Sequence, residues 1–167
     1  MDSRKLSLLE RTQTALTNGS APNPIVVTVN SENQGKFHTE IKMRSHTLQS
    51  DQPFGFEGTN KGPKPSELVL AALAACQETT WRIYAEHMQI PINRISVELR
   101  GTQDLRGFMN VSSKVPAGFQ KVEGTVKIDS PVSHDRLIEL QKEVDAHCPV
   151  LDDLTRVVPV EFSVKKI

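Results

Sequence analysis

The sequence predicts an α+β fold: one domain over residues 21–167, preceded by a helical arm at residues 1–20. Three observations lead to this prediction. A chain of 167 residues is about one domain long, with enough core to fold without metals or disulfides. Its strand and helix patterns follow the order β-β-loop-α-β-β-α-β, which is not the regular alternation of a parallel βαβ fold. No segment of the chain repeats.

An amphipathic helix is predicted over residues 2–17, where leucines and alanines recur among polar residues before Asn18 and Gly19. Residues 20–24 form a linker. The β-branched run at residues 24–29 then predicts the first strand.

Residues 37–48 predict the second strand, because apolar and polar residues alternate there after a turn signal at residues 32–35. Residues 49–64 are rich in glycine and proline and lack periodicity. We expect a long loop there, and long loops in compact domains are often functional.

A buried helix is predicted from Pro65 to near Met88. Proline suits the first helical position, and the acid Glu67 suits the first turn. Residues 68–75 are apolar on every face, so we expect this part of the helix to be buried all round. The helix becomes amphipathic towards its end.

The rest of the chain is predicted to hold three strands, a helix and a helical turn. The strands are expected at residues 95–99, 122–128 and 157–164, the helix at 133–147 and the turn at 149–155.

Charge and hydropathy exclude several classes of function. The chain has 20 basic and 20 acidic residues, and this zero net charge argues against a non-specific nucleic-acid binder. The longest apolar run, residues 68–76, is far shorter than the roughly 20 residues of a membrane span. The first residues also lack the apolar core of a secretion signal. We therefore expect a cytoplasmic protein that binds neither nucleic acid nor membranes.

Two cysteines, Cys76 and Cys148, are the strongest candidates for chemistry. They lack the paired spacing of a zinc site, and in a reducing compartment they are expected to be free thiols. Cys76 lies in the apolar helix, where a cysteine often serves as a small hydrophobic residue. A reactive Cys76 needs a cation or a backbone donor nearby. Both interpretations stay open at this point.

Cys148 precedes Pro149, so it is expected to be extended and to cap the helical turn that follows. The N-terminus of that turn lowers a thiol pKa. A small side chain at a helix junction explains the residue equally well. His147 is either a neighbouring base or only a partner of the helix dipole. We expect no metal and no cofactor.

Two motifs in the sequence resemble the OsmC/Ohr family, the osmotically inducible and organic hydroperoxide resistance proteins. One runs from Gly58-Thr59-Asn60 through a proline and an acid into the Ala/Leu-rich helix that carries Cys76; the other is Cys148-Pro149-Val150. The resemblance covers the chain from about residue 25 to the end. It implies an OsmC-like fold, with curved antiparallel sheets around a buried central helix, in an intertwined homodimer.

By this resemblance the protein is expected to be a cysteine-based peroxidase, an antioxidant oxidoreductase of the oxidative stress response. Cys76 would be the peroxidatic thiolate that reduces organic hydroperoxides, and Cys148 the resolving thiol. The resulting disulfide would be reduced by an external dithiol, of the lipoyl type or another small one. The apolar helix would then wall a pocket for lipid-like or aromatic peroxides.

The sequence departs from the family pattern near Cys76. The hydroperoxidase branch has a glutamate ten residues before the reactive cysteine, but here that position is Ser66. Glu67, nine residues before, lies about half a turn from the cysteine face of an ideal helix. It is a candidate catalytic carboxylate or only a first-turn acid. Arg44 is a candidate for the activating cation, whereas Arg82 points about 120° away from Cys76; either is also explained as a surface charge.

Two alternatives to a peroxidase remain. One is a non-enzymatic redox sensor or small apolar-ligand-binding protein on the same scaffold. The other is a metal site in which His147 or His46 joins both cysteines.

Overall fold

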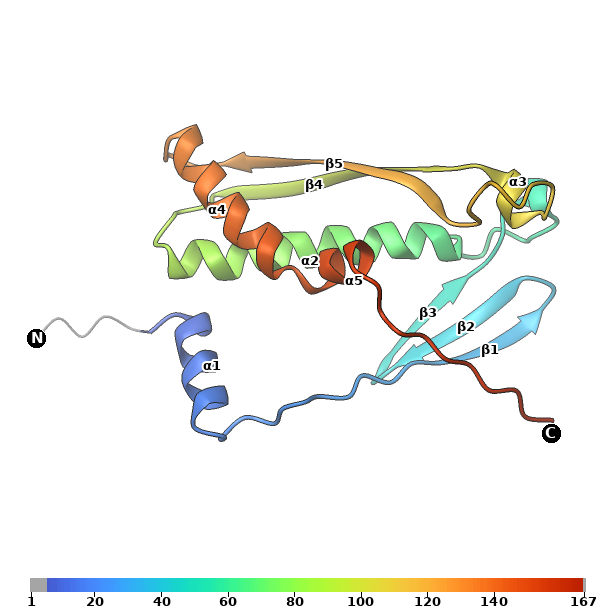
Figure 1. Ribbon diagram of the computed structural model, residues 1–167, viewed down its shortest axis with the longest axis horizontal. Coiled ribbons are helices and arrows are strands. Elements are labelled where there is room, and N and C mark those ends of the chain that lie inside the picture. The colour runs from blue at the N-terminus through green and yellow to red at the C-terminus, as the bar shows by residue number, and fades with distance from the viewer. Residues whose placement is uncertain (1–5, 167) are drawn as a thin grey trace, which may run out of the picture.

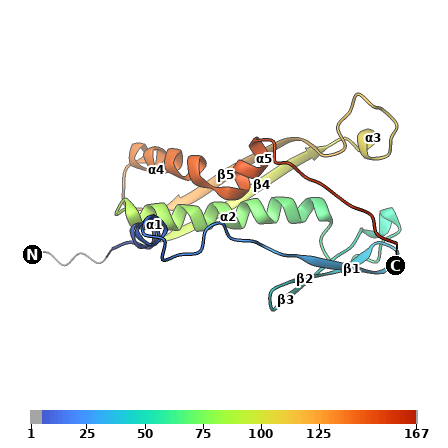
Figure 2. The same cartoon turned by 60° about the horizontal axis from the view of Figure 1, so that its bottom comes forward.

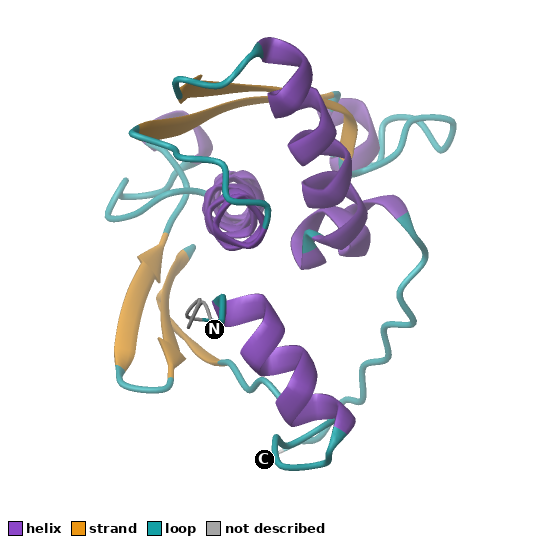
Figure 3. Ribbon diagram, turned by 90° about the vertical axis from the view of Figure 1, so that its left-hand side faces the viewer, coloured by secondary structure: helices purple, strands orange, loops and turns teal. Residues whose placement is uncertain are grey.

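The computed structural model describes residues 6–166, and its centre is a long helix, α2 (Pro65–His87). The hairpin of β4 (Arg94–Gln103) and β5 (Phe119–Asp129) covers one side of α2. Helices α4 (His134–His147) and α5 (Pro149–Thr155) cover another side (Figures 1 and 3). The predicted central helix, the following hairpin and the two later helical segments are therefore confirmed, as is the α+β class.

The core lies over the C-terminal half of α2. Trp81 and Ala85 of α2 pack with Leu140 and Val144 of α4, both of which are completely buried, and with Ile90. Helical spacing places each of these pairs on one face of its helix, so two apolar stripes meet. This contact fixes α4, and therefore the start of α5, against α2.

The β4–β5 hairpin presents an apolar face to α2. In its antiparallel register Ile95 lies opposite Ile128, and Val97 lies opposite Val126. Three of these four residues, Ile95, Ile128 and Val126, pack against the core cluster. Period-two alternation puts such residues on one face of the hairpin, which explains why both strands were predictable from the sequence.

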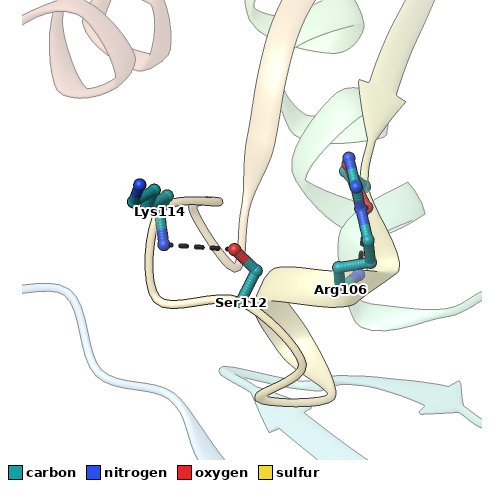
Figure 4. Close-up of polar contacts among 4 residues, drawn as sticks. Arg106, Ser112 and Lys114 are labelled. Carbon is teal, nitrogen blue, oxygen red and sulfur yellow. Dashed lines mark hydrogen bonds and ion pairs between the residues drawn. The ribbon is translucent and has the colours of Figure 1, made fainter.

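Local polar contacts organise the tip of this hairpin (Figure 4). Asp104 accepts a hydrogen bond from the Arg106 backbone N–H at the start of α3 (Leu105–Phe108), and it also pairs with the Arg106 guanidinium. Further along, the Lys114 N–H donates to the Ser112 hydroxyl. The connection between β4 and β5 is therefore a long, ordered loop with a short helix, not a tight turn.

A second antiparallel sheet consists of β1 (Asn30–Gly35), β2 (His38–Met43) and β3 (His46–Ser50). The predicted single strand over residues 37–48 is wrong, because Arg44 adopts a left-handed φ of 53° and the chain reverses there. The predicted turn at residues 32–35 is likewise wrong, since these residues belong to β1. The turn at Arg44 contains neither glycine nor proline, and such a turn gives little signal in the sequence.

The loop predicted at residues 49–64 begins two residues later, because Gln49 and Ser50 complete β3. A short 3₁₀ helix, η1 (Phe54–Phe56), lies within the loop. Its last residues lead directly into α2.

The strands predicted at residues 24–29 and 157–164 are also wrong for this chain. Neither segment forms a strand, and both are drawn as plain coil (Figures 1 and 2). A β-strand needs a neighbour to complete its hydrogen-bond ladder, and within residues 6–166 neither segment has one. Their apolar side chains stand in solvent: Val27 is 80% exposed and Phe162 is 95% exposed.

Burial of the first half of α2 is incomplete, which corrects the expectation for residues 68–75. Only Leu73 in this stretch is buried, and Val69 is 38% exposed. Within residues 6–166, other elements cover only one side of this half of α2. The apolar residues 68–75 therefore have an uncovered face.

The N-terminal arm contains α1 (Leu8–Thr17), which falls within the predicted helix. The predicted start at residue 2 lies outside the described residues. Ser7 caps α1: its hydroxyl accepts from the Glu10 N–H, and the Glu10 carboxylate accepts from the Ser7 N–H. Among residues 6–166, no helix combines the length and apolarity needed to cross a membrane.

Candidate thiol site

The structure brings the two cysteines together from distant parts of the chain. The Cys148 thiol donates a hydrogen bond to Cys76 Sγ, with 3.4 Å between the two sulfurs. Both are free thiols. A disulfide has an S–S length of about 2.05 Å, so a small movement of either side chain is enough to join them.

Two local features place Cys148. It ends α4 and caps α5, with an extended backbone (φ −77°, ψ 111°), and Pro149 follows at the first position of α5. The prediction that Cys148 caps a helical turn is confirmed. Because Leu140 and Val144 pack α4 against α2, the Cys148 thiol at the end of α4 lies beside the middle of α2, where Cys76 is.

Burial dominates the electrostatics of Cys148. Its side chain is 1% exposed, and this desolvation raises the pKa of the thiol. The Leu151 N–H and the Thr80 hydroxyl oppose the rise, whereas the neighbouring Cys76 adds to it. The helix N-terminus does lower this pKa, through the Leu151 N–H, but loss of water outweighs the donors and the net shift is upward. Cys148 is a neutral thiol at neutral pH.

Cys76 is the more accessible thiol. Its side chain is half-buried on α2, whereas Cys148 is enclosed. A reagent that arrives from solvent therefore meets Cys76 first.

Thr80 belongs to this site and was missed at the sequence level. It lies one turn after Cys76 on α2, is 5% exposed, and its hydroxyl donates to the Cys76 carbonyl at 2.8 Å. The same hydroxyl favours the Cys148 thiolate. The available signal was the i, i+4 spacing, which puts Cys76 and Thr80 on one face of the helix.

Glu67 and Arg44, the two charged residues predicted from the sequence to act at the site, make their contacts away from the cysteine pair. Glu67 begins α2: its carboxylate accepts from the Lys64 N–H at 2.9 Å and pairs with the Lys64 ammonium at 3.6 Å. Arg44 is exposed in the turn between β2 and β3. Within residues 6–166, neither makes a hydrogen bond to Cys76 or Cys148.

Other polar candidates are also held elsewhere. Arg82 donates to the Ile92 carbonyl at 2.6 Å. The His147 ring stacks on Tyr84 with centroids 5.0 Å apart, and its Nδ1 lies 2.7 Å from the Glu143 carbonyl. No group of three or more metal-ligating side chains occurs in the described part of the chain. A metal site that joins His147 or His46 to the cysteines is therefore not present there.

The Gly-Thr-Asn motif has a structural role before α2. Asp51 is buried and accepts hydrogen bonds from the Thr59 hydroxyl at 2.6 Å and from the Thr59 and Lys61 N–H groups. These bonds, that from the Thr59 hydroxyl first, lower the Asp51 pKa to about 2. Gly58 fits because a Cβ there would lie 1.8 Å from the Gln52 carbonyl oxygen. Asp51 was not among the residues predicted from the sequence to matter for the site.

A cavity of about 690 Å³ lies beside α2, between the β4–β5 hairpin and the α4–α5 segment. Neither cysteine lines it. Its apolar wall includes Leu73, Val97, Leu99, Phe119, Leu151 and Leu154.

A family model described as OsmC-like protein matches residues 58–163. The match includes both cysteine motifs and omits α1 and the β1–β2–β3 sheet. No curated protein sequence is significantly similar to the chain.

Several solved structures share this fold. An OsmC-like protein from Mycoplasma pneumoniae has a TM-score of 0.70 at 21% identity, covering 80% of this chain and 90% of that one. An organic hydroperoxide resistance protein OsmC from Legionella pneumophila has a TM-score of 0.62 at 17% identity, with 80% and 92% coverage. An organic hydroperoxide resistance protein from Elizabethkingia anophelis has a TM-score of 0.59 at 16% identity, with 81% and 91% coverage.

Proposed function

The chain belongs to the OsmC-like protein family, and from this premise we propose that it is a two-cysteine peroxidase that reduces organic hydroperoxides. The observation that carries the proposal is the 3.4 Å separation of Cys76 and Cys148, the only two cysteines in the sequence. The substrate class is supported by the structural neighbours described as organic hydroperoxide resistance proteins.

Cys76 is the attacking thiol in this proposal, because it is the accessible one. Its thiolate attacks the terminal oxygen of the hydroperoxide, and the O–O bond breaks. The alkoxide takes a proton and leaves as an alcohol, while Cys76 becomes a sulfenic acid. Two electrons pass from the sulfur to the peroxide.

Cys148 then resolves the sulfenic acid. Its sulfur attacks Cys76 Sγ, an S–S bond forms, and the S–O bond breaks. The departing hydroxide combines with the Cys148 proton to give water. An external dithiol reduces the disulfide by thiol–disulfide exchange and restores both thiols. Both cysteines of the chain are consumed in this disulfide, so the reductant comes from outside the chain.

We also propose that the working protein is a homodimer. The uncovered side of α2 at residues 68–75 and the exposed apolar segments at residues 24–29 and 157–164 support a second chain. Among the helices and strands of residues 6–166, the β1–β2–β3 sheet makes extensive contacts only between its own strands. A sheet and a helix face left without cover are features of a surface that packs against a partner.

The direct test is intact mass after one equivalent of cumene hydroperoxide. The wild-type protein should lose about two mass units per chain as the disulfide forms, and a dithiol should reverse the change. Cys76→Ser should not react. Cys148→Ser should stop at the sulfenic acid, which dimedone traps on Cys76.

An unchanged wild-type mass with both thiols still titratable would contradict the proposal for this substrate. A dimedone adduct on Cys148 in place of Cys76 would reverse the two roles.

Binding of an apolar ligand is a second candidate function, favoured by the cavity of about 690 Å³ that neither cysteine lines. A medium-chain fatty acid that raises the melting temperature equally in wild type and in Cys76→Ser would support it, because binding there is independent of the thiol. A ligand effect that is lost in Cys76→Ser would assign the binding to the thiol site instead.

A further inference from the structure

We propose that the cavity beside α2 binds an uncharged medium-chain carbonyl compound, such as an aliphatic ester or ketone, and that the Gln77 side-chain NH₂ donates a hydrogen bond to its carbonyl oxygen. This binding rests on the second candidate function, binding of an apolar ligand, and adds the chemical class of that ligand. It is independent of the peroxidase proposal, because neither cysteine lines the cavity.

Gln77 is a buried polar residue on the α2 wall of the cavity. Its side chain is 7% exposed, and Leu73, one turn earlier on the same face of α2, is also buried and lines the cavity. An unpaired polar group in an apolar setting costs stability, so the polar atoms of buried side chains are ordinarily hydrogen-bonded. The partners of the Gln77 amide therefore indicate what kind of group the cavity can bind.

Only the oxygen of the Gln77 amide is paired with another side chain. The Trp81 indole N–H donates to Gln77 Oε1 at 3.2 Å, and Trp81 is itself buried in the core. An indole N–H can only donate, so this bond places the amide oxygen towards Trp81 and the NH₂ away from it. The fold therefore sets the orientation of the amide before any ligand binds.

The NH₂ of Gln77 faces the cavity. Within residues 6–166 this group has no hydrogen-bond partner. Yet every fully buried side-chain nitrogen and oxygen in that part of the chain has one. The NH₂ group is therefore in contact with open space, and the open space that Gln77 lines is the cavity. It offers a donor to a ligand.

The rest of the wall suits an aliphatic chain. The β4–β5 hairpin contributes Val97, Leu99 and Phe119, and α5 contributes Leu151 and Leu154. Figure 3 shows the hairpin and the α4–α5 segment on two sides of α2. The volume of about 690 Å³ lies within the range of roughly 300–1,000 Å³ that is usual for small-molecule sites. Such a cavity gains most from burying apolar surface, with one polar contact to orient the ligand.

The charges of the lining favour an uncharged head group. Lys121 and Asp145 are the charged residues that line the cavity. Lys121 pairs with Glu123 at 2.6 Å, whereas Asp145 accepts a hydrogen bond from the Gln141 side chain at 3.3 Å. A carboxylate ligand would therefore meet a cation that is already paired and an acid that repels it. A neutral carbonyl oxygen avoids both penalties and still accepts from Gln77.

The test compares methyl octanoate with octanoate by isothermal titration calorimetry of the reduced protein at neutral pH. The two ligands have the same chain and differ in the charge of the head group. Wild type should bind the ester more tightly than the acid. Gln77→Met keeps the length of the side chain but has no N–H donor, so it should bind the ester about fivefold more weakly, with little change for octanoate.

Gln141→Met is the matched control. Gln141 lines the same cavity, but its NH₂ already donates to Asp145. We therefore expect Gln141→Met to bind both ligands as wild type does.

A measurement on wild type covers the case in which Gln77→Met folds poorly, because that substitution leaves the Trp81 N–H without its acceptor. In nitrogen-15 spectra, the side-chain NH₂ resonances of Gln77 should move downfield when methyl octanoate binds, and those of Gln141 should stay in place. Gln77→Glu, which keeps an oxygen for Trp81, assigns the resonances by their loss.

Equal affinity of the ester for wild type and Gln77→Met, with unmoved Gln77 NH₂ resonances, would overturn this role of Gln77 and leave the binding function in place. Tighter binding of octanoate than of methyl octanoate would overturn the proposed ligand class. If neither ligand binds, the binding function fails together with the proposed ligand, and the peroxidase proposal is unaffected.

Discussion

Asp51 shows at the scale of one residue how hydrogen bonds hold a charge inside the protein. Its folded pKa of about 2 lies below the ordinary value of 3.8. The carboxylate therefore stabilises the fold fully above about pH 4, and this stabilisation is lost as the pH falls towards 2. In Asp51→Asn the fall of the melting temperature across this window should become shallower, while Glu98 and Asp104, whose pKa values are also lowered by their ion-pair partners, keep part of it.

Thermal melts at several pH values between about 5 and 2 test this prediction. Asp145→Asn is the control, because Asp145 is exposed on α4. If Asp51→Asn retains the acid-dependent loss of stability seen in wild type, the Asp51 network is not its source.

The residues of the site differ in how visible they are in the sequence. Cys76 and Cys148 stand out because they are the only cysteines and lie in two recognisable motifs. Thr80 and Asp51 do not, because a threonine in a helix and an aspartate before a loop are ordinary residues until their partners are known. The partner of Thr80 is the Cys76 carbonyl, and the partners of Asp51 are the Thr59 hydroxyl and backbone N–H groups of the loop.

At the scale of secondary structure, α4 depends on two residues that it buries against α2. Leu140→Ala should lower the free energy of unfolding by about 2–5 kcal/mol, because the side chain is completely buried and leaves a cavity. Urea denaturation measures the change.

Ile138→Ala on the same helix is the matched control. Its side chain is 38% exposed, and we expect a loss below about 1 kcal/mol. Equal losses in the two variants would show that α4 is not anchored through Leu140.

Helices were predicted better than strands, for a physical reason. The limits of α2, α4 and α5 depend on local signals: a proline at the first position, a capping serine at Ser133 and a cysteine before Pro149. A strand also depends on a neighbour that is distant in sequence. The hairpin of β4 and β5 has that neighbour, but residues 24–29 and 157–164 do not, although their patterns are as strong.

At the scale of the whole molecule, these unpaired segments distinguish a single chain from a dimer. Phe162 is 95% exposed in the single chain, so Phe162→Asp should change the stability of a monomer by no more than about 0.5 kcal/mol. If residues 157–164 pack against a second chain, the same substitution buries a charge in an apolar interface. The wild-type mass in solution should then be twice the 18.6 kDa of one chain, and Phe162→Asp should lower it.

Light scattering after size-exclusion chromatography measures both masses. A dimer also predicts that the melting temperature rises with protein concentration, because association stabilises the folded chain by mass action. Phe108→Asp is the control: this phenylalanine is 63% exposed at the hairpin tip, outside both unpaired segments. A wild-type mass of one chain at all concentrations would contradict the homodimer. A dimer that persists in Phe162→Asp would instead place the interface on the uncovered side of α2 at residues 68–75 or on residues 24–29, the other apolar surfaces that stay exposed in the single chain.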